Sequence, residues 1–162
     1  WDKIYEKDGS FFGEKPSDFA ISCYDTMKDR TKTILELGCG QGRDSLFFAS
    51  KSIEVKALDY SRFAIEQLSK RAKQTGLPIE ASVCDTTKPL PFNDDEFDAV
   101  YSHMLFSMKF SREQLKFIFK EIRRIFRNDG FHFFSVRNRN DKFYGKRHMS
   151  ISIRRFTLTP TV

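Results

Sequence analysis

Three alternating glycines follow the first apolar run of the chain, and a carboxylate precedes them. In ILELGCGQGRDS, residues 34–45, the order is Glu36, Gly38, Gly40 and Gly42. Glycine has no Cβ, so it adopts positive φ angles and lets a ligand lie against the backbone. A helix that starts after the glycines would point free N–H groups into the same space. The spacing therefore predicts a ligand-binding turn between a strand and a helix, with a tight turn that binds nothing as the alternative.

The glycine pattern differs from the fingerprint of dinucleotide-binding proteins. That fingerprint, G-x-G-x-x-G, has its third glycine three residues after the second. Counted from Gly40, this position holds Arg43, and the pattern here is G-x-G-x-G. A Rossmann-type oxidoreductase or another nucleotide-binding protein is therefore the less favoured interpretation.

Two aspartates stand where further contacts to a nucleoside are expected. Asp59 ends the second predicted strand, about 20 residues after Gly40, and a carboxylate at that spacing accepts hydrogen bonds from ribose hydroxyls. Asp85 ends the third predicted strand, where an adenine edge would lie. Either aspartate could instead cap the helix or turn that follows it. Together with the glycines, they favour one elongated nucleoside ligand.

Strand and helix patterns alternate along the chain. Apolar runs predict strands at residues 32–38, 53–59, 79–85, 97–103 and 131–136. Helical spacing of apolar residues predicts helices at residues 15–27, 43–52, 61–76 and 115–126. This order indicates an α/β fold of the Rossmann-like type, a doubly wound and mostly parallel sheet with helices on both faces.

Local signals define several of these helices further. Ser17 or Asp18 would cap the first helix, and Ser61 the third. The second helix would turn Leu46, Phe47 and Ala49 toward the core. The last would be closed by NDG at residues 128–130.

The composition excludes several classes of protein. With 40% hydrophobic residues and 18 Phe, the chain is too apolar to be disordered. No apolar run approaches the ~20 residues of a membrane span, and the polar start shows no signal peptide. A cytoplasmic location without a membrane partner is therefore expected. Buried free thiols are expected at Cys23, Cys39 and Cys84, because their number is odd and they form no CxxC. No metal site is expected, since the histidines make no ligand pattern with them.

Five stretches together resemble the ordered motifs of class I S-adenosylmethionine-dependent methyltransferases: ILELGCGQGRDS, VKALDYS, SVCD, LPFNDDEFDAVYS and EIRRIFRNDGFHFFSV. The resemblance covers about residues 1–146. Within the family, the chain looks most like small-molecule enzymes of the tellurite-resistance and methyltransferase-domain type. These share GCGQGRDS and an N-terminal pattern that here comprises Trp1, Tyr5, Phe12, Pro16 and Ser17.

The resemblance implies S-adenosylmethionine as cofactor and assigns roles to the first turn. Glu36 would neutralise the methionine ammonium, directly or through water. Gly38 and Gly40 would pass their backbone close to the cofactor, with Cys39 and Gly42 in the same turn. Arg43 and Asp44 fit the subgroup motif, but no role beyond opening the helix follows from the sequence.

The resemblance also assigns the adenosine contacts. Asp59 would hold the ribose hydroxyls, Tyr60 would pack on the adenine, and Asp85 would accept from the adenine amine. The full set of positions expected on this side is Asp59, Tyr60, Ser61, Cys84, Asp85 and Thr86.

The methyl-transfer end is expected after the fourth strand, where Ser102 and His103 would face the sulfonium. In-line displacement needs positioning and, for a poor nucleophile, a base. His103 is the candidate base, and a polar group lining the pocket is the alternative. Tyr5, Phe11 and Phe12 would close over the cofactor as a lid, with ordinary packing of the N-terminal segment as the alternative. The apolar residues that follow the fourth strand would line the acceptor pocket or belong to the core. They are Met104, Leu105, Phe106, Met108 and Phe110.

One methyltransferase domain over residues 1–162 is expected, with a lid and helix at 1–30, a core at 31–136 and a basic tail at 137–162. Family members continue with a helix and an antiparallel strand pair, so the pair is expected to be incomplete here. A non-catalytic relic that binds the cofactor is therefore an alternative to an active enzyme with a small-molecule acceptor.

The charge distribution supports another alternative, an RNA-directed methyltransferase. The net charge is +6, yet residues 109–162 hold 14 Lys/Arg and only 4 Asp/Glu, whereas residues 1–108 hold 14 and 18. A basic segment attracts anionic partners. Aromatic residues are not interleaved with the basic ones as stacking platforms would be, which disfavours nucleic acid.

Overall fold

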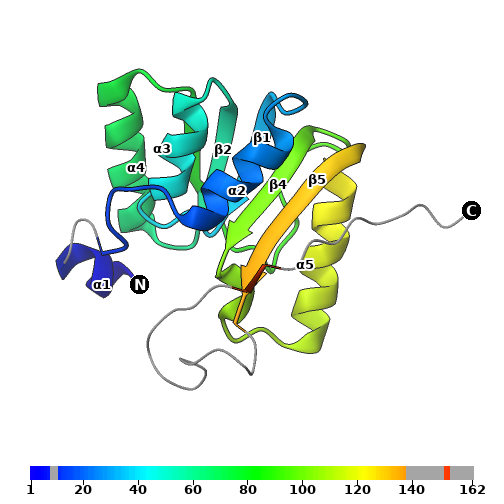
Figure 1. Cartoon of the computed structure of the whole chain (residues 1–162). Coiled ribbons are helices and arrows are strands. Elements are labelled where there is room, and N and C mark those ends of the chain that lie inside the picture. The colour runs from blue at the N-terminus through cyan, green and yellow to red at the C-terminus, as the bar shows by residue number, and fades with distance from the viewer. Residues whose placement is uncertain (8–10, 138–151, 154–162) are drawn as a thin grey trace, which may run out of the picture.

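A largely parallel sheet forms the centre of the fold (Figure 1). The computed structural model describes residues 1–7, 11–137 and 152–153, and within them six strands follow the order β3-β2-β1-β4-β5-β6. The strands are β1 (Thr33–Leu37), β2 (Glu54–Asp59), β3 (Ile79–Val83), β4 (Phe97–His103), β5 (Phe126–Val136) and β6 (Ser152–Ile153). The first five run parallel, and β6 pairs antiparallel with β5. The predicted doubly wound α/β fold is confirmed, and its strand order reverses between β1 and β4.

Helices cover both faces of the sheet (Figure 1). They are α1 (Asp2–Lys7), α2 (Asp18–Met27), α3 (Arg43–Ser50), α4 (Arg62–Thr75) and α5 (Arg112–Ile125), with a short 3₁₀ helix η1 (Leu105–Ser107). Three of them, α2, α3 and α4, pack on one face, and α5 packs on the other. No helix within the described ranges is long and apolar enough to cross a membrane.

Burial on both faces explains why β1 is a continuous apolar run. Successive side chains of a strand point to opposite faces. Ile34 therefore joins the core under α2 and α3, whereas Leu35 joins the core under α5. Strands buried on both faces lose the apolar–polar alternation that marks a solvent-facing strand.

The helix starts follow the sequence signals closely. Ser17 accepts from the N–H of Ala20 and caps α2, and Ser61 accepts from the N–H of Ala64 and caps α4. In α3 the predicted inner stripe is only partly right. Ala49 is buried, but the residue fully buried beside it is Phe48, while Leu46 and Phe47 are half-buried.

The predicted end of the last helix is wrong. α5 ends at Ile125, and β5 starts at once with Phe126, so NDG at 128–130 lies within the strand. The backbone N–H of Glu96 bonds the carbonyl of Ile125, which draws the chain into the sheet. The extra residues are absorbed by a shift in the β4–β5 register, from Phe97 opposite Phe126 to Ala99 opposite Phe131.

The crossover from β3 to β4 has no helix, and side chains of α5 hold it in place. Glu121 accepts from the N–H of Leu90 at 2.9 Å, and Arg124 donates to the carbonyls of Leu90 and Phe92. Arg124 also holds the pKa of the Glu121 carboxyl below its usual range. These bonds satisfy backbone groups that a helix would have satisfied internally.

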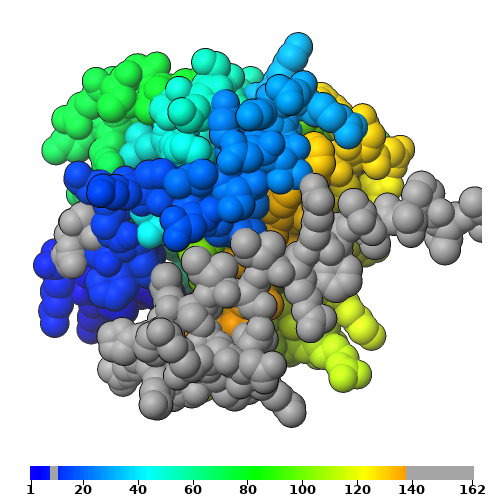
Figure 2. All heavy atoms as spheres, viewed as in Figure 1, coloured from blue at the N-terminus to red at the C-terminus, as the bar shows by residue number. Residues whose placement is uncertain are grey.

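The N-terminal segment packs along the surface as an aromatic cluster. Trp1 stacks on Tyr5 with ring centroids 5.5 Å apart, and Phe12 meets Tyr5 edge-on at 6.4 Å. The space-filling view shows this segment, in dark blue, beside α4, in green (Figure 2). Most of the predicted basic tail, residues 137–162, lies outside the described residues, and so does the expected incomplete strand pair apart from β6.

The start of α3 supplies a test of the fold. Gly42 caps this helix with φ of 81°, and a Cβ there would overlap the Leu68 side chain of α4, 2.8 Å from its Cγ. Gly76 has φ of +66° but open space around it. Left-handed backbone costs a non-glycine residue roughly 1–2 kcal/mol, and overpacking adds roughly 1–3 kcal/mol. Gly42→Ala should therefore lower the free energy of unfolding in urea clearly more than the matched control Gly76→Ala. Equal losses in the two variants would contradict the packing account.

Candidate functional site

The carboxyl ends of four parallel strands meet at one edge of the sheet and line a groove there. Ligands of doubly wound sheets bind at this edge, where the strand order reverses. The groove holds about 900 Å³, within the range of small-molecule sites. The wall residues at or just after the ends of β1, β2, β3 and β4 are Gly38, Asp59, Tyr60, Cys84, Asp85, Thr86, His103 and Met104.

Asp59 sits where the turn after β1 meets the end of β2. One carboxylate oxygen accepts from the N–H of Gly40 and the other from the N–H of Ser61, each at 2.8 Å. Burial raises the pKa of Asp59, and these two N–H bonds act against that rise. Each oxygen keeps a second lone pair, so the side chain shapes the glycine turn and still has capacity for hydroxyl donors in the groove.

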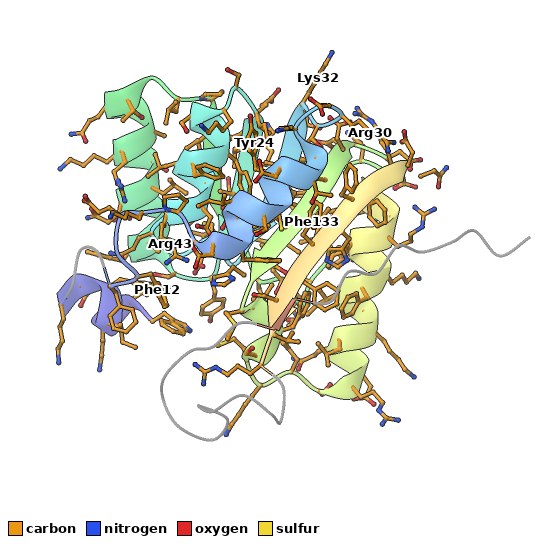
Figure 3. The ribbon with its side chains drawn as sticks, in the orientation of Figure 1. Phe12, Tyr24, Arg30, Lys32, Arg43 and Phe133 are labelled. Carbon is orange, nitrogen blue, oxygen red and sulfur yellow. The ribbon has the colours of Figure 1, made fainter. Side chains whose placement is uncertain are left out.

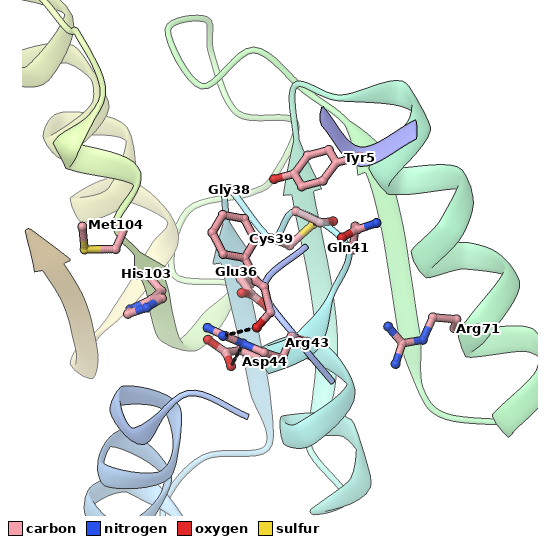
Figure 4. Close-up of a pocket in the computed structure, with 13 residues that line it drawn as sticks. Tyr5, Glu36, Gly38, Cys39, Gln41, Arg43, Asp44, Arg71, His103 and Met104 are labelled. Atoms are coloured by element: carbon pink, nitrogen blue, oxygen red, sulfur yellow. Dashed lines mark hydrogen bonds and ion pairs between the residues drawn. The ribbon is translucent and has the colours of Figure 1, made fainter. Parts of the chain in front are cut away.

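Glu36 lies deeper, in a small recess of about 70 Å³ that opens beside the groove. Its side chain is buried, and the Ser45 hydroxyl of α3 donates to it. Burial and the nearby Asp44 carboxylate raise the pKa of Glu36. Figure 4 shows Glu36 and Asp44 at the centre of the recess, with His103 and Met104 on one side and Arg71 on the other. A buried carboxylate with a raised pKa is complementary to a cation.

Asp44 forms a network that the sequence did not reveal. Its carboxylate accepts from the backbone N–H and the hydroxyl of Ser17 and from the hydroxyl of Tyr101, each at 2.8 Å. The guanidinium of Arg43 bonds it at 3.2 Å and also donates to the carbonyl of Phe12 (Figure 3). The network therefore joins the N-terminal segment, α2 and β4 to the start of α3. The signal available in the sequence was a charged pair placed directly after the glycines.

Asp85 follows β3 and lines the groove with its neighbours Cys84 and Thr86. Its predicted nucleoside contact stays a prediction, whereas its alternative role in the following turn is seen. Its carboxylate also accepts from the hydroxyl and the N–H of Thr87, and the hydroxyl contributes most to lowering its pKa. Cys84 is only half-buried, in contrast to the predicted burial of all three thiols.

Three predicted site residues do not reach the walls of the groove or the recess. Ser61 is buried, caps α4 and donates its hydroxyl to Asp2. Ser102 is fully buried within β4 and is not among the residues that line the groove or the recess. Gly42 is the N-cap of α3, whereas Gly38, Cys39 and Gly40 do line the recess.

His103 stands at the end of β4, where the groove and the recess meet. Its ring stacks on Phe19 at 5.6 Å, and its Nδ1 lies 2.8 Å from the Ser135 hydroxyl. Burial lowers the pKa of His103, so the ring is neutral at physiological pH.

Aromatic and apolar residues form most of the rest of the groove, together with Ser107 and Arg137. Gln41 accepts from the N–H of Phe11, which ties the N-terminal segment to the glycine turn. The apolar wall residues are Trp1, Ile4, Tyr5, Phe11, Phe12, Met104, Leu105, Met108 and Phe110, while Phe106 packs instead against Phe119 and Phe134. In the part of the chain that the structure describes, no three His, Cys, Asp or Glu side chains are grouped to hold a metal ion.

Comparisons with known proteins agree with this architecture. The solved structure on conversion of a disulfide bond into a thioacetal group during echinomycin biosynthesis is 22% identical, with a TM-score of 0.73 over 89% of this chain and 60% of that chain. TehB from Haemophilus influenzae is 21% identical, with a TM-score of 0.67 over 83% of this chain and 44% of that one. At these identities the likeness establishes the fold, and the predicted subgroup stays a prediction.

Sequence matches add the family. The curated protein Hemagglutinin 1 from Eikenella corrodens is 32% identical over 72 residues, which are 44% of this chain and only 23% of that protein. The family model described as "Methyltransferase domain" matches residues 34–130, a range that contains the glycine turn, Asp59, Asp85 and β4. The chain therefore belongs to the methyltransferase-domain family of class I S-adenosylmethionine-dependent methyltransferases.

Proposed function

We propose that this chain binds S-adenosylmethionine in the groove and transfers its methyl group to a small-molecule acceptor by in-line displacement. The observation that carries the proposal is the convergence of Glu36, the glycine turn, Asp59 and Asp85 on one continuous groove and recess. The segment at residues 1–30 and the core at residues 31–136 would act as one binding domain.

The side chains fit the chemical groups of this cofactor. Asp59 offers carboxylate lone pairs to ribose hydroxyls, and Tyr60, which is 77% exposed, offers a ring face beside them. Asp85 offers a carboxylate to the adenine amine. Glu36 offers a buried carboxylate to the ammonium of the methionine part. The bound cofactor supplies a methyl group already activated on a sulfonium, so the protein chiefly has to hold the acceptor in line and exclude water.

The apolar half of the groove supports a small-molecule acceptor. Leu105, Met108 and Phe110, which follow β4, form part of the groove wall together with His103. A largely apolar concave wall with few polar groups is typical of small-molecule sites. The residues proposed to face the methyl group are His103 and Met104, at the end of β4.

Titration with S-adenosylhomocysteine tests the cofactor site. Asp59→Asn removes the charge that would hold the ribose hydroxyls, so binding should weaken by about 1.5–3 kcal/mol, roughly 10- to 150-fold. Asp98→Asn is the matched control. Asp98 likewise accepts from two backbone N–H groups, but it lies near the start of β4, beside the first residues of β1 and at the opposite end of these strands from the groove. Calorimetry should give micromolar binding to the unaltered chain and to Asp98→Asn. Equal affinity of Asp59→Asn would contradict the ribose contact, and no binding by the folded chain would contradict the proposed function.

The pH dependence of binding tests the role of Glu36. Its raised pKa means that a proton is held more tightly in the free protein, and an ammonium group beside it would expel that proton. Binding of S-adenosylhomocysteine should therefore release protons and become tighter as pH rises toward and through the raised pKa of Glu36.

Calorimetry in buffers of different ionisation enthalpy counts the released protons. Glu36→Gln keeps a group that accepts from the Ser45 hydroxyl but cannot titrate, so it should lose both the pH dependence and the proton release. Proton release that persists in Glu36→Gln would assign the effect to another group.

A further inference from the structure

His103 and Ser135 are register partners on the neighbouring strands β4 and β5. The Ser135 oxygen receives the backbone N–H of Met104 at 2.9 Å and lies 2.8 Å from Nδ1 of His103. Ser135 is fully buried, and these are the hydrogen bonds of its hydroxyl among residues 1–7, 11–137 and 152–153. The position of each hydrogen in this cluster can therefore be worked out.

A serine hydroxyl has one hydrogen to donate and two lone pairs. If Nδ1 of His103 carried the hydrogen, the Ser135 oxygen would accept from both Met104 and His103. Its own hydrogen would then be buried without an acceptor, which is costly. If Nδ1 carries no hydrogen, the hydroxyl donates to it and every group in the cluster is paired. The neutral ring then has its hydrogen on Nε2.

We propose that Ser135 is a positioning residue that holds His103 as the Nε2–H tautomer, so that the ring presents a hydrogen-bond donor to the acceptor end of the groove. Nδ1 faces Ser135, so Nε2 is the nitrogen left to meet a ligand, and His103 lines both the groove and the recess. Stacking on Phe19 keeps the plane of the ring fixed. His103 thus donates a hydrogen bond to the acceptor and takes no proton from it. This role rests on the proposed function, and it differs from the predicted role of His103 as a base.

This tautomer narrows the class of acceptor. The reacting atom must arrive with a free lone pair, as in an oxyanion, a thiolate or a neutral amine. That lone pair forms the bond to the methyl carbon, and the electron pair of the carbon–sulfur bond returns to sulfur. With an anionic acceptor, the negative charge of the acceptor and the positive charge of the sulfonium are both lost in the transfer. The charges therefore balance without a proton transfer. An oxygen of the acceptor beside the reacting atom is the partner expected for Nε2–H.

Side-chain NMR of the ¹⁵N-labelled full chain measures the tautomer directly. At a pH where His103 is neutral, its Nδ1 should give the signal of an unprotonated ring nitrogen and its Nε2 that of a protonated one. Comparison with His103→Gln assigns the signals. Ser135→Ala should lose this fixed pattern and show mixed tautomers, whereas Ser135→Thr, which keeps the hydroxyl, should retain it.

A protonated Nδ1 in the unaltered chain overturns the proposal, even if Ser135→Ala does not fold. An unchanged pattern in a folded Ser135→Ala overturns it as well. The spectra are recorded without cofactor, so failure here is distinct from failure of the cofactor titration, which would instead remove the proposed function.

Discussion

The buried carboxylate of Asp44 is the interaction on which the geometry of this site depends. A carboxylate away from water must be paired with donors, or it is expelled or neutralised. Here the donors come from Ser17, Arg43 and Tyr101, which lie on three parts of the chain. The Asp44 carboxylate therefore fixes the start of α2, the start of α3 and the position of both helices against β4. These three positions determine the shape of the groove.

The same burial gives the recess its electrostatic character. Glu36 and Asp44 are close enough for Asp44 to raise the pKa of Glu36, while Arg43 acts in the opposite direction. Asp44 already has the neighbouring donors, whereas Glu36 has the hydroxyl of Ser45. The carboxylate that is less well supplied with donors is thus the one at the position proposed for the ammonium. Asp44 is thus paired with donors of the protein, and Glu36 is the carboxylate proposed to meet the ammonium.

Much of the fold was predictable, because its signals are local. Ser17 and Ser61 cap their helices through residues three positions on, and the glycine turn is encoded within one short stretch. The Asp44 network was not predictable, since Ser17 and Tyr101 are far from Asp44 in the sequence and only the packed sheet brings them together. The prediction that NDG at residues 128–130 ends the last helix was wrong for a related reason. It favours a turn locally, but here it lies in the irregular part of β5, between Phe126 and Phe131. These two residues pair with Phe97 and Ala99 of β4, and their pairing keeps the stretch between them within the strand. Placement of Ser102 and Ser61 away from the groove likewise depends on strand and cap geometry.

The N-terminal segment and the glycine turn form one mechanical unit. Gln41 in the glycine turn accepts from the backbone of Phe11, and Arg43, the first residue of α3, donates to the backbone of Phe12. Tyr5 lies so close to Gly40 that a Cβ there would approach its hydroxyl within 2.9 Å. A shift of the glycine turn would therefore shift the aromatic wall formed by Tyr5, Phe11 and Phe12, and a shift of this wall would shift the turn. The shape of the proposed cofactor site and the position of the aromatic wall beside it are consequently coupled by the same contacts.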